Sequence, residues 1–298
     1  MKNALICAAR SAYYAVTEPH KLKNARLDHL DGVDGVWNHG DPLVSVIIPT
    51  FNRVELLLER ALPSVFAQTY KNVEIIVVFH GCEPRKPRTA GPPSAFYESF
   101  GYQDRAQHTA GPDVYEYVWD KLKLRAIGIK REPKYPPTAE NHWFAGPVDP
   151  INAGLKAANG HWIARVDDDD TWTPDHIERL LRFAQQRDLE FVSGGHSTHD
   201  KPYVEPYRVN LTRDVGGVQT WLYRSYLRSF RANPDCWRKR HNRVNDTDLQ
   251  QRFANAGVRM GYLRRVVAHI SPRPGETVIG LKAYQQNRAE TERNLAFR

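Results

Sequence analysis

The sequence has few cysteines and no long hydrophobic run. The three cysteines, Cys7, Cys82 and Cys236, are odd in number and far apart, which excludes a disulfide framework and a paired zinc site and indicates a reducing compartment. No stretch approaches the roughly 18 apolar residues of a membrane helix. The first apolar run ends at Arg10, short of the length of a signal peptide. We therefore exclude the integral membrane and secreted classes and expect a cytoplasmic protein.

Two nucleotide-binding signatures are also missing. The sequence contains neither the dinucleotide fingerprint G-x-G-x-x-G nor the P-loop pattern G-x-x-x-x-G-K-[S/T] after a predicted strand. What remains is a chain of 298 residues, 41% hydrophobic and 26% charged. This length and composition are typical of one large globular domain or two small ones.

Basic residues are in excess, with a net charge of +8. Such a charge suits a nucleic acid, an anionic membrane surface or a phosphorylated substrate, although ordinary solubility explains it equally well. The basic run at 238–243 is more typical of a solvated loop, or of a contact with an anionic acceptor or membrane surface, than of a nucleic-acid site. We expect no nucleic acid partner and leave a peripheral membrane contact open.

The hydrophobic pattern predicts alternating strands and helices. Residues 43–48 form a short apolar run closed by Pro49, residues 53–68 have helical spacing with a kink or split at Pro63, and residues 73–78 form a second apolar run. Strand, helix and strand at this spacing make a βαβ unit, which builds parallel sheets.

Later segments continue the pattern. We predict helices at 150–159, closed by Gly160, and at 246–256, begun by Asn245 or Asp246 and closed by Gly257. A third helix begins after Thr173 as N-cap, followed by Pro174. Residues 1–41 are expected to be irregular and 80–148 to leave the sheet, apart from one strand near 123–129. Further strands are predicted at 161–166, 189–192, 218–223 and 259–270.

Four consecutive aspartates at 167–170 follow a predicted buried strand. Like charges this close repel, and Mg²⁺ or Mn²⁺ would neutralise them. In a nearly straight loop, Asp167 and Asp169 would point the same way. Ligands of open α/β sheets bind at the carboxyl ends of strands. This favours a metal site over a solvated acidic turn that caps the next helix.

Three other places carry polar side chains with less decisive patterns. Asp246 and Asp248 begin a predicted helix, where helix capping is the simplest interpretation and a general base the functional one. His269 in a late strand is more typical of a structural histidine than of a ligand. The turn at 49–53 is either a plain connection or a nucleotide contact through backbone groups and Asn52.

Taken together, these segments resemble the GT-A glycosyltransferases, specifically the inverting family 2. The resemblance implies an α/β GT-A fold, with a single mixed, mostly parallel sheet flanked by helices. It places an N-terminal extension at 1–41, the GT-A domain at 42–271 with a long insertion at about 80–148, and a helical tail at 272–298. The segments that carry it, in the family's order and spacing, are residues 46–53, 73–78, 152–160, 166–174 and 245–257.

The resemblance also implies roles for individual residues. Asp169 would bind Mn²⁺ or Mg²⁺ directly, Asp167 would contact the ribose or the metal through water, and His269 matches a late metal ligand of some members. Asp246 would be the catalytic base. The remaining implied contacts are with the nucleotide sugar, through Pro49, Thr50, Phe51, Asn52, Arg53, Asn152, Asp167 and Asp168, and with the acceptor, through Trp172 and Asp248.

The chain departs from the family pattern in three places. Phe79 and His80 stand where the family has aspartates that help to read uracil, Ile151 replaces an arginine, and Asn245 replaces a glutamate. These changes are compatible with a different donor or with weakened catalysis. They motivate an alternative function, a catalytically degenerate protein that binds a sugar nucleotide or a glycan on the same scaffold.

The expected function is nevertheless that of an enzyme. We expect a metal-dependent inverting glycosyltransferase, of the hexosyltransferase type, that moves a sugar from a nucleoside diphosphate sugar, with a UDP-sugar favoured, to an acceptor hydroxyl. The acceptor is a glycan, a lipid-linked sugar or a small molecule. Whether the chain forms a homo-oligomer is left open.

Overall fold

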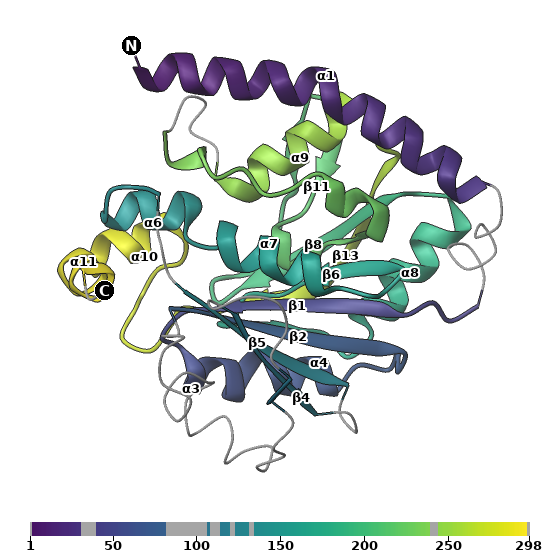
Figure 1. Cartoon of the computed structure of the whole chain (residues 1–298). Helices are drawn as coiled ribbons and strands as arrows, with labels where there is room; N and C mark the ends of the chain where they lie inside the picture. Colours follow the sequence, from purple (N-terminus) through teal and green to yellow (C-terminus); the bar gives the residue numbers. More distant parts are fainter. Residues whose placement is uncertain are drawn as a thin grey trace.

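The computed structural model describes residues 2–30, 40–81, 106–107, 114–119, 123–130, 134–238 and 244–296. Within these ranges the chain forms one large mixed sheet with helices on both faces (Figure 1). No helix in the described ranges is long and apolar enough to cross a membrane. The basic run at 239–243 lies outside the described residues.

The centre of the sheet is parallel. Its strands are β5 (Leu124–Ile129), β2 (Val73–His80), β1 (Val44–Thr50) and β6 (Trp162–Arg165), in that order. They are apolar on both faces because helices cover both sides. The predicted strands are thus confirmed, but β1 does not stop at Pro49. Pro49 pairs with β2 only, since the β6 register ends two residues earlier, so its missing N–H leaves no ladder bond unmade on the β6 side.

Beyond β6 the sheet becomes mixed. Strand β12 (Leu222–Arg224) runs antiparallel between β6 and β8 (Phe191–Thr198). Strand β13 (Met260–Ile270) is parallel to β8 and antiparallel to β7 (Asp170–Trp172). The predicted strand at 218–223 is half wrong, because a 3-10 turn, η3 (Val218–Thr220), precedes β12. The shorter strands are β9 (Lys201–Val204), paired with β8, and the hairpin β10 (Tyr207–Val209) and β11 (Arg213–Val215).

The predicted excursion at 80–148 is in part a continuation of the sheet. Strand β4 (Val114–Trp119) pairs antiparallel with β5, and β3 (Ala106–Gln107) pairs with β4. The expectation that only residues near 123–129 join the sheet is therefore wrong. Apart from Glu116, the run Val114–Trp119 consists of valines and aromatic residues, a strand signal that the surrounding prolines and glycines obscured.

Helices cover each face of the sheet with a separate core. One core includes α3 (Val54–Leu56), η1 (Leu57–Ala61), α4 (Leu62–Phe66) and α8 (His176–Gln186). Residues 54–66 form one continuous helical stretch, in which the π-turn η1 lies just before Pro63. This is the predicted interruption, because proline has no N–H to donate an i→i−4 bond. The apolar stripe predicted for α8 is buried: Ile177, Leu180, Leu181 and Ala184.

The opposite face is covered by α7 (Val148–Ala157) and α9 (Asn245–Ala256). Gly257 ends α9 in the left-handed conformation, as predicted. The C-terminal segment contains α10 (Leu281–Gln286) and α11 (Arg288–Ala296), and α10 packs on α6 (Ala139–Ala145). Two further 3-10 turns, η4 (Ser225–Ser229) and η5 (Cys236–Arg238), precede α9.

Three predicted helix boundaries are wrong. Helix α8 begins at His176, because the His176 N–H bonds the carbonyl of Thr173 and tightens residues 173–175 into a turn. The residue before α9 is Val244, and no side chain caps this helix. Helix α7 ends before Gly160, which instead lies against β1: a Cβ there would come within 2.6 Å of the Ser45 backbone nitrogen. Glycine is required at 160 by close packing rather than by a helix cap.

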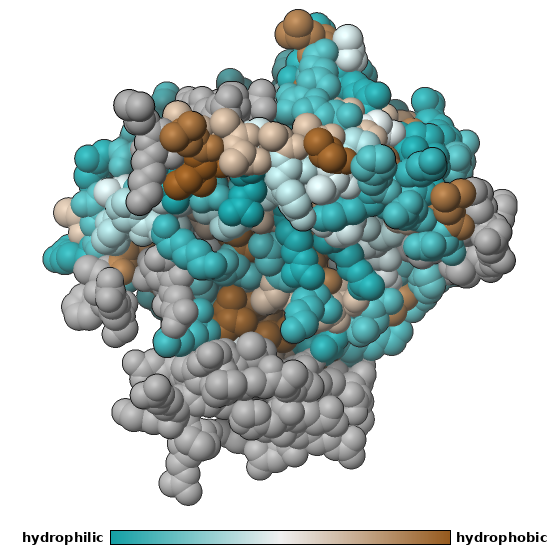
Figure 2. Space-filling model, turned by 45° about the horizontal axis from the view of Figure 1, so that its top comes forward, coloured by the Kyte–Doolittle hydropathy of each residue, from teal (hydrophilic) through white to brown (hydrophobic). Residues whose placement is uncertain are grey.

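The N-terminal segment is a long helix, α1 (Lys2–Leu30), so the prediction of irregular chain is wrong for these residues. Its buried side mixes polar and apolar residues and contains Pro19, which hides the helical period. Leu22 enters the core of the α9 face, and Arg26 pairs with the buried Glu190 at 2.6 Å. Figure 1 shows α1 lying across α9. With this side tilted forward, the surface is mainly hydrophilic, with a few separate hydrophobic side chains (Figure 2).

Candidate functional site

The four aspartates lie at the carboxyl end of β6, where the chain turns into β7. Arg165, the last residue of β6, holds Asp167 with a guanidinium-to-carboxylate distance of 2.9 Å. Arg53 lies 3.1 Å from Asp168 and 3.3 Å from Asp169. The loop therefore combines four carboxylates with arginines from two neighbouring strand ends, which reduces their mutual repulsion.

The carboxylates divide into two buried and two partly exposed groups. Asp168 and Asp170 are almost fully buried. Burial raises the pKa of Asp168 to about 6, against the opposing charge of Arg53, and burial followed by the charge of Asp169 raises the pKa of Asp170 well above its usual range. The side chains of Asp167 and Asp169 are 35% and 21% exposed. This second pair is therefore the more accessible to a ligand.

The residues after β1 form the next wall. Arg53 reaches the acidic loop and also donates to the Tyr284 hydroxyl at 2.7 Å. Phe51 packs near two histidine rings, those of His80 at 6.2 Å and His142 at 5.5 Å between centroids. His80, at one of the positions where the resemblance pointed to missing carboxylates, thus takes part in an aromatic group at the ends of β1 and β2. Rings of this kind suit a nucleobase by stacking.

Two residues of the C-terminal tail complete this wall, and the sequence analysis missed both. The Arg273 guanidinium lies 4.5 Å from the centre of the Tyr284 ring and 4.0 Å from the Asp169 carboxylate. Arg273 is oriented by Glu276 at 2.6 Å. No sequence motif identifies these two residues as site residues. The sequence shows only that an arginine and a tyrosine occur in a polar C-terminal segment. Packing of α10 on α6 brings Tyr284 to the site.

Asp246 approaches from the other sheet face, in the first turn of α9. Burial raises its pKa, and the nearby charge of Arg165 opposes the rise. The side chain of Asn245, the residue before it, lies 3.5 Å from the Arg165 guanidinium and 3.4 Å from the Phe144 carbonyl. Arg165 therefore lies between the acidic loop and the start of α9 and couples the two.

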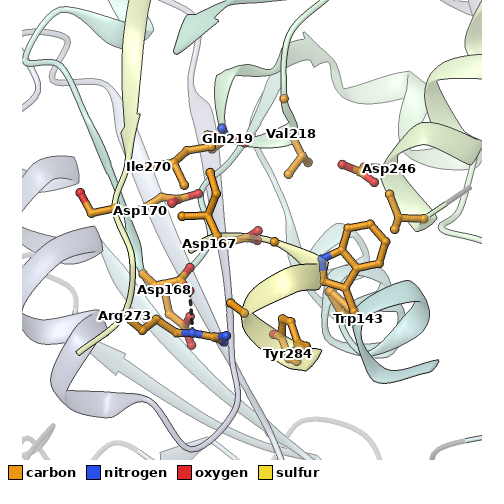
Figure 3. A pocket seen from close by; sticks show the side chains of 18 of the residues that line it. Trp143, Asp167, Asp168, Asp170, Val218, Gln219, Asp246, Ile270, Arg273 and Tyr284 are labelled. Carbon is orange, nitrogen blue, oxygen red and sulfur yellow. Dashed lines mark ion pairs between the residues drawn. The ribbon is translucent and has the colours of Figure 1, made fainter. Parts of the chain in front are cut away.

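One cavity of about 790 Å³ joins these groups. Figure 3 shows Asp167 near its middle, with Asp168, Arg273 and Tyr284 on one side and Asp246 and Trp143 on the other. A cavity of this size at the carboxyl ends of parallel strands is the ordinary place for a ligand of an α/β protein. The residues predicted for the site that line it are Pro49, Thr50, Phe51, Arg53, Asp167, Asp168, Asp169 and Asp246.

The structure does not bring five other predicted residues into this cavity. Trp172 is buried and stacks on His176, with ring centroids 4.0 Å apart. Its indole N–H donates to the Gln219 carbonyl. Asn152 bonds the backbone of Ala232. The remaining three are Asn52, which is exposed with a positive φ of 53°, His269, whose ring bonds Ser197, and Asp248, which pairs with Arg252 at 2.9 Å.

The donor set suits a divalent ion shared with a phosphorylated ligand. In the described ranges no group of three or more His, Cys, Asp or Glu side chains is arranged to hold a metal by itself. Mg²⁺ in proteins is commonly held by one or two carboxylates together with substrate phosphates and water. Asp167 and Asp169, partly exposed in the cavity, fit this kind of site. His269 does not line it.

Comparisons with known proteins agree with what the geometry of the site indicates. A sequence model described as "Glycosyl transferase family 2" matches residues 45–83 and 140–268, more than half of the chain. The uncharacterised glycosyltransferase EpsJ of Bacillus subtilis is 29% identical over 169 residues, 55% of this chain and 38% of EpsJ. The Escherichia coli protein WfgD, named a UDP-Glc:α-D-GlcNAc-diphosphoundecaprenol β-1,3-glucosyltransferase, is 24% identical over 64% of each chain. The chain thus spans less than two thirds of these relatives.

Solved structures show the same fold. Mannosyltransferase PcManGT from Pyrobaculum calidifontis, in complex with GDP-Man and Mn²⁺, has a TM-score of 0.53 at 16% identity and covers 92% of this chain and 70% of that one. TarS 1-349 from S. aureus, in complex with UDP-GlcNAc, has a TM-score of 0.50 at 17% identity and covers 85% and 70%. The predicted GT-A fold, with a mixed sheet flanked by helices, is confirmed.

Proposed function

The chain belongs to glycosyl transferase family 2, and we propose that it is a metal-dependent, inverting enzyme that moves a sugar from a nucleoside diphosphate sugar to an acceptor hydroxyl. The observation that carries this proposal is the cavity in which Asp246 faces the acidic loop, with Arg165 between them. In a single displacement, the leaving group and the proton acceptor lie on opposite sides of the reacting carbon. Here the acidic loop would face the leaving group, and Asp246 would face the acceptor.

The donor lies with its base against Phe51, His80 and His142 and its diphosphate toward Arg53 and Arg273. These arginines carry positive charge in a largely enclosed place, where such charge stabilises developing negative charge most effectively. A Mn²⁺ or Mg²⁺ ion held by Asp167 and Asp169 would supply Lewis-acid stabilisation of the departing diphosphate. A UDP-sugar is favoured because WfgD is named for UDP-Glc and the similar TarS structure is in complex with UDP-GlcNAc.

Asp246 acts as the general base. The acceptor hydroxyl gives its proton to the Asp246 carboxylate while its oxygen forms a bond to the anomeric carbon. The bond from that carbon to the phosphate oxygen breaks, and its electron pair leaves with the nucleoside diphosphate. A single displacement of this kind inverts the anomeric configuration. The charge of Arg165 favours the ionised, proton-accepting form of Asp246 and so opposes the rise in pKa that burial causes.

The first test is a thermal-shift panel of UDP, GDP, CDP, TDP and ADP, each with and without Mn²⁺. A ligand at a hundred times its dissociation constant stabilises the native state by about 2.7 kcal/mol. We expect one nucleotide to raise the melting temperature and Mn²⁺ to increase that rise. Asp169→Ala removes the increase due to Mn²⁺. The absence of a shift with every nucleotide contradicts the proposal, and a shift without turnover of any sugar nucleotide supports a degenerate binding protein instead.

A further inference from the structure

The cavity wall around Asp246 has a composition different from the rest. Trp143 comes from α6, Val218 from η3 and Tyr207 from β10, three elements that are distant in the sequence. In Figure 3 Trp143 and Val218 lie on two sides of the space in front of Asp246. Aromatic and aliphatic side chains therefore line the same cavity as the Asp246 carboxylate.

Trp143 is held as a fixed surface. Its ring meets Phe144 edge to face, with centroids 5.1 Å apart and planes at 84°. The short helix that carries it begins at a Thr138 cap, whose hydroxyl accepts from the Asn141 N–H, and α10 packs against it. An aromatic ring positioned in this way loses little entropy when a ligand covers it.

Tyr207 closes the other side. The side chain is 58% exposed, so its ring is available to a ligand. Tyr207 lines the same cavity as Asp246. Burial, followed by the nearby charge of Asp246, raises the pKa of the Tyr207 hydroxyl. The hydroxyl can therefore donate to a ligand oxygen bound beside Asp246.

We propose that Trp143, Val218 and Tyr207 form the acceptor subsite and that its ligand is a neutral pyranose. A pyranose has an apolar face of C–H groups and an edge of hydroxyls. The face fits the indole of Trp143, while one hydroxyl reaches Asp246 and another reaches Tyr207. Anionic acceptors fit less well, because two carboxylates, those of Asp246 and Asp167, face this space against the single guanidinium of Arg165 that lies between them. The inference rests on the proposed function and names its acceptor class.

The test is direct binding, which needs no knowledge of the natural acceptor. Saturation-transfer NMR is recorded with the methyl glycosides of glucose, N-acetylglucosamine and mannose, and with methyl glucuronide as an anionic probe that lacks a phosphate. We expect wild type to bind at least one of the three neutral glycosides more tightly than the glucuronide, with the saturation strongest on the C–H face of the ring. Trp143→Ala weakens that binding about tenfold, whereas Trp143→Phe, which keeps an aromatic face, retains most of it.

Two controls separate the subsite from the fold and from the donor site. Tyr13→Ala removes a tyrosine of similar exposure, 53%, on the distant helix α1 and leaves glycoside binding unchanged. The nucleotide thermal shift of Trp143→Ala reports whether that variant is folded. Binding of no neutral methyl glycoside, tighter binding of the glucuronide, or equal binding by wild type and Trp143→Ala overturns the inference. A failed nucleotide panel with intact glycoside binding instead overturns the donor part of the proposed function.

Discussion

Helix α9 carries two carboxylates, two residues apart, whose surroundings differ completely. Asp246 faces the cavity, where burial raises its pKa. Asp248 faces away, where Arg252 lies 2.9 Å from it and Asn233 donates at 3.3 Å. Arg252 is buried, pairs also with Glu18 of α1 and stacks over Tyr14. One side of the helix presents to the cavity a carboxylate whose pKa is raised, and the other side binds α1 through Arg252. Each side can be tested without the other.

The largest expected effect is that of Asp246→Asn. The amide has the same shape but cannot accept a proton, so we expect turnover to fall by about 10²–10⁴-fold, the usual contribution of a general base. Nucleotide binding and stability are retained, because Asp246 makes no ion pair with α1. Initial rates of sugar transfer and the melting temperature measure the two quantities. Turnover within threefold of wild type would exclude Asp246 as the base.

On the opposite side, Arg252→Met removes the ion pair that joins α9 to α1, together with the pair that Arg252 makes with Asp248. The variant leaves Glu18, 2% exposed, without its guanidinium partner. Removing one member of a buried ion pair costs about 3–5 kcal/mol, so urea denaturation should show a loss of this order. A loss below about 1 kcal/mol would mean that water replaces the arginine, which the burial of Glu18 argues against.

Asp248→Asn is the matched partner of Asp246→Asn. It weakens the contacts with Arg252 and Asn233, and we expect a loss of unfolding free energy of about 1–3 kcal/mol. Turnover of the folded variant stays close to wild type, because Asp248 does not line the cavity. If turnover falls while stability is unchanged, the acceptor role that the sequence suggested for Asp248 is correct after all.

A smaller effect is expected from Tyr284→Phe on the donor side. The variant loses the hydroxyl that accepts from Arg53 but keeps the ring near Arg273. One hydrogen bond to a charged group is worth about 1.5–3 kcal/mol at most, and Arg53 retains its carboxylate partners, so we expect a nucleotide dissociation constant raised about fivefold. Titration calorimetry measures it, with Tyr262→Phe on β13 as a control. An unchanged dissociation constant would show that Tyr284 does not contribute to nucleotide binding.

The pH profile gives the smallest and most specific effect. A general base must be ionised, and the pKa of Asp246 is raised, so kcat/KM should fall on the acid side at a higher pH than the value near 3.9 of an ordinary aspartate. Arg165→Met removes a charge that lowers this pKa, and the acid limb should move further upward. A limb that stays in place in Arg165→Met would show that another group controls it.

Much of the scaffold was predictable because it rests on local signals. The apolar runs of β1 and β2 can only be buried strands, and the end of α9 follows from Gly257, whose φ of 85° suits glycine. The sequence also identified the acidic loop and Asp246 as candidates. It failed at α1 because a helix whose buried side is rich in charged residues has no clear apolar period. It failed at Gly160 because a close approach to β1 and a helix cap both require the same residue.

The sequence by itself determined which residue types are available: a run of carboxylates after a buried strand, an aspartate at the start of a helix, and arginines near both. Only the tertiary structure decided which of them share a cavity. Arg273 and Tyr284 enter it from a polar tail, more than a hundred residues from the acidic loop, while Asp248 leaves it for Arg252. The reason is physical: a side chain's partner is set by which faces pack together, and that packing depends on the whole core rather than on neighbours in the chain.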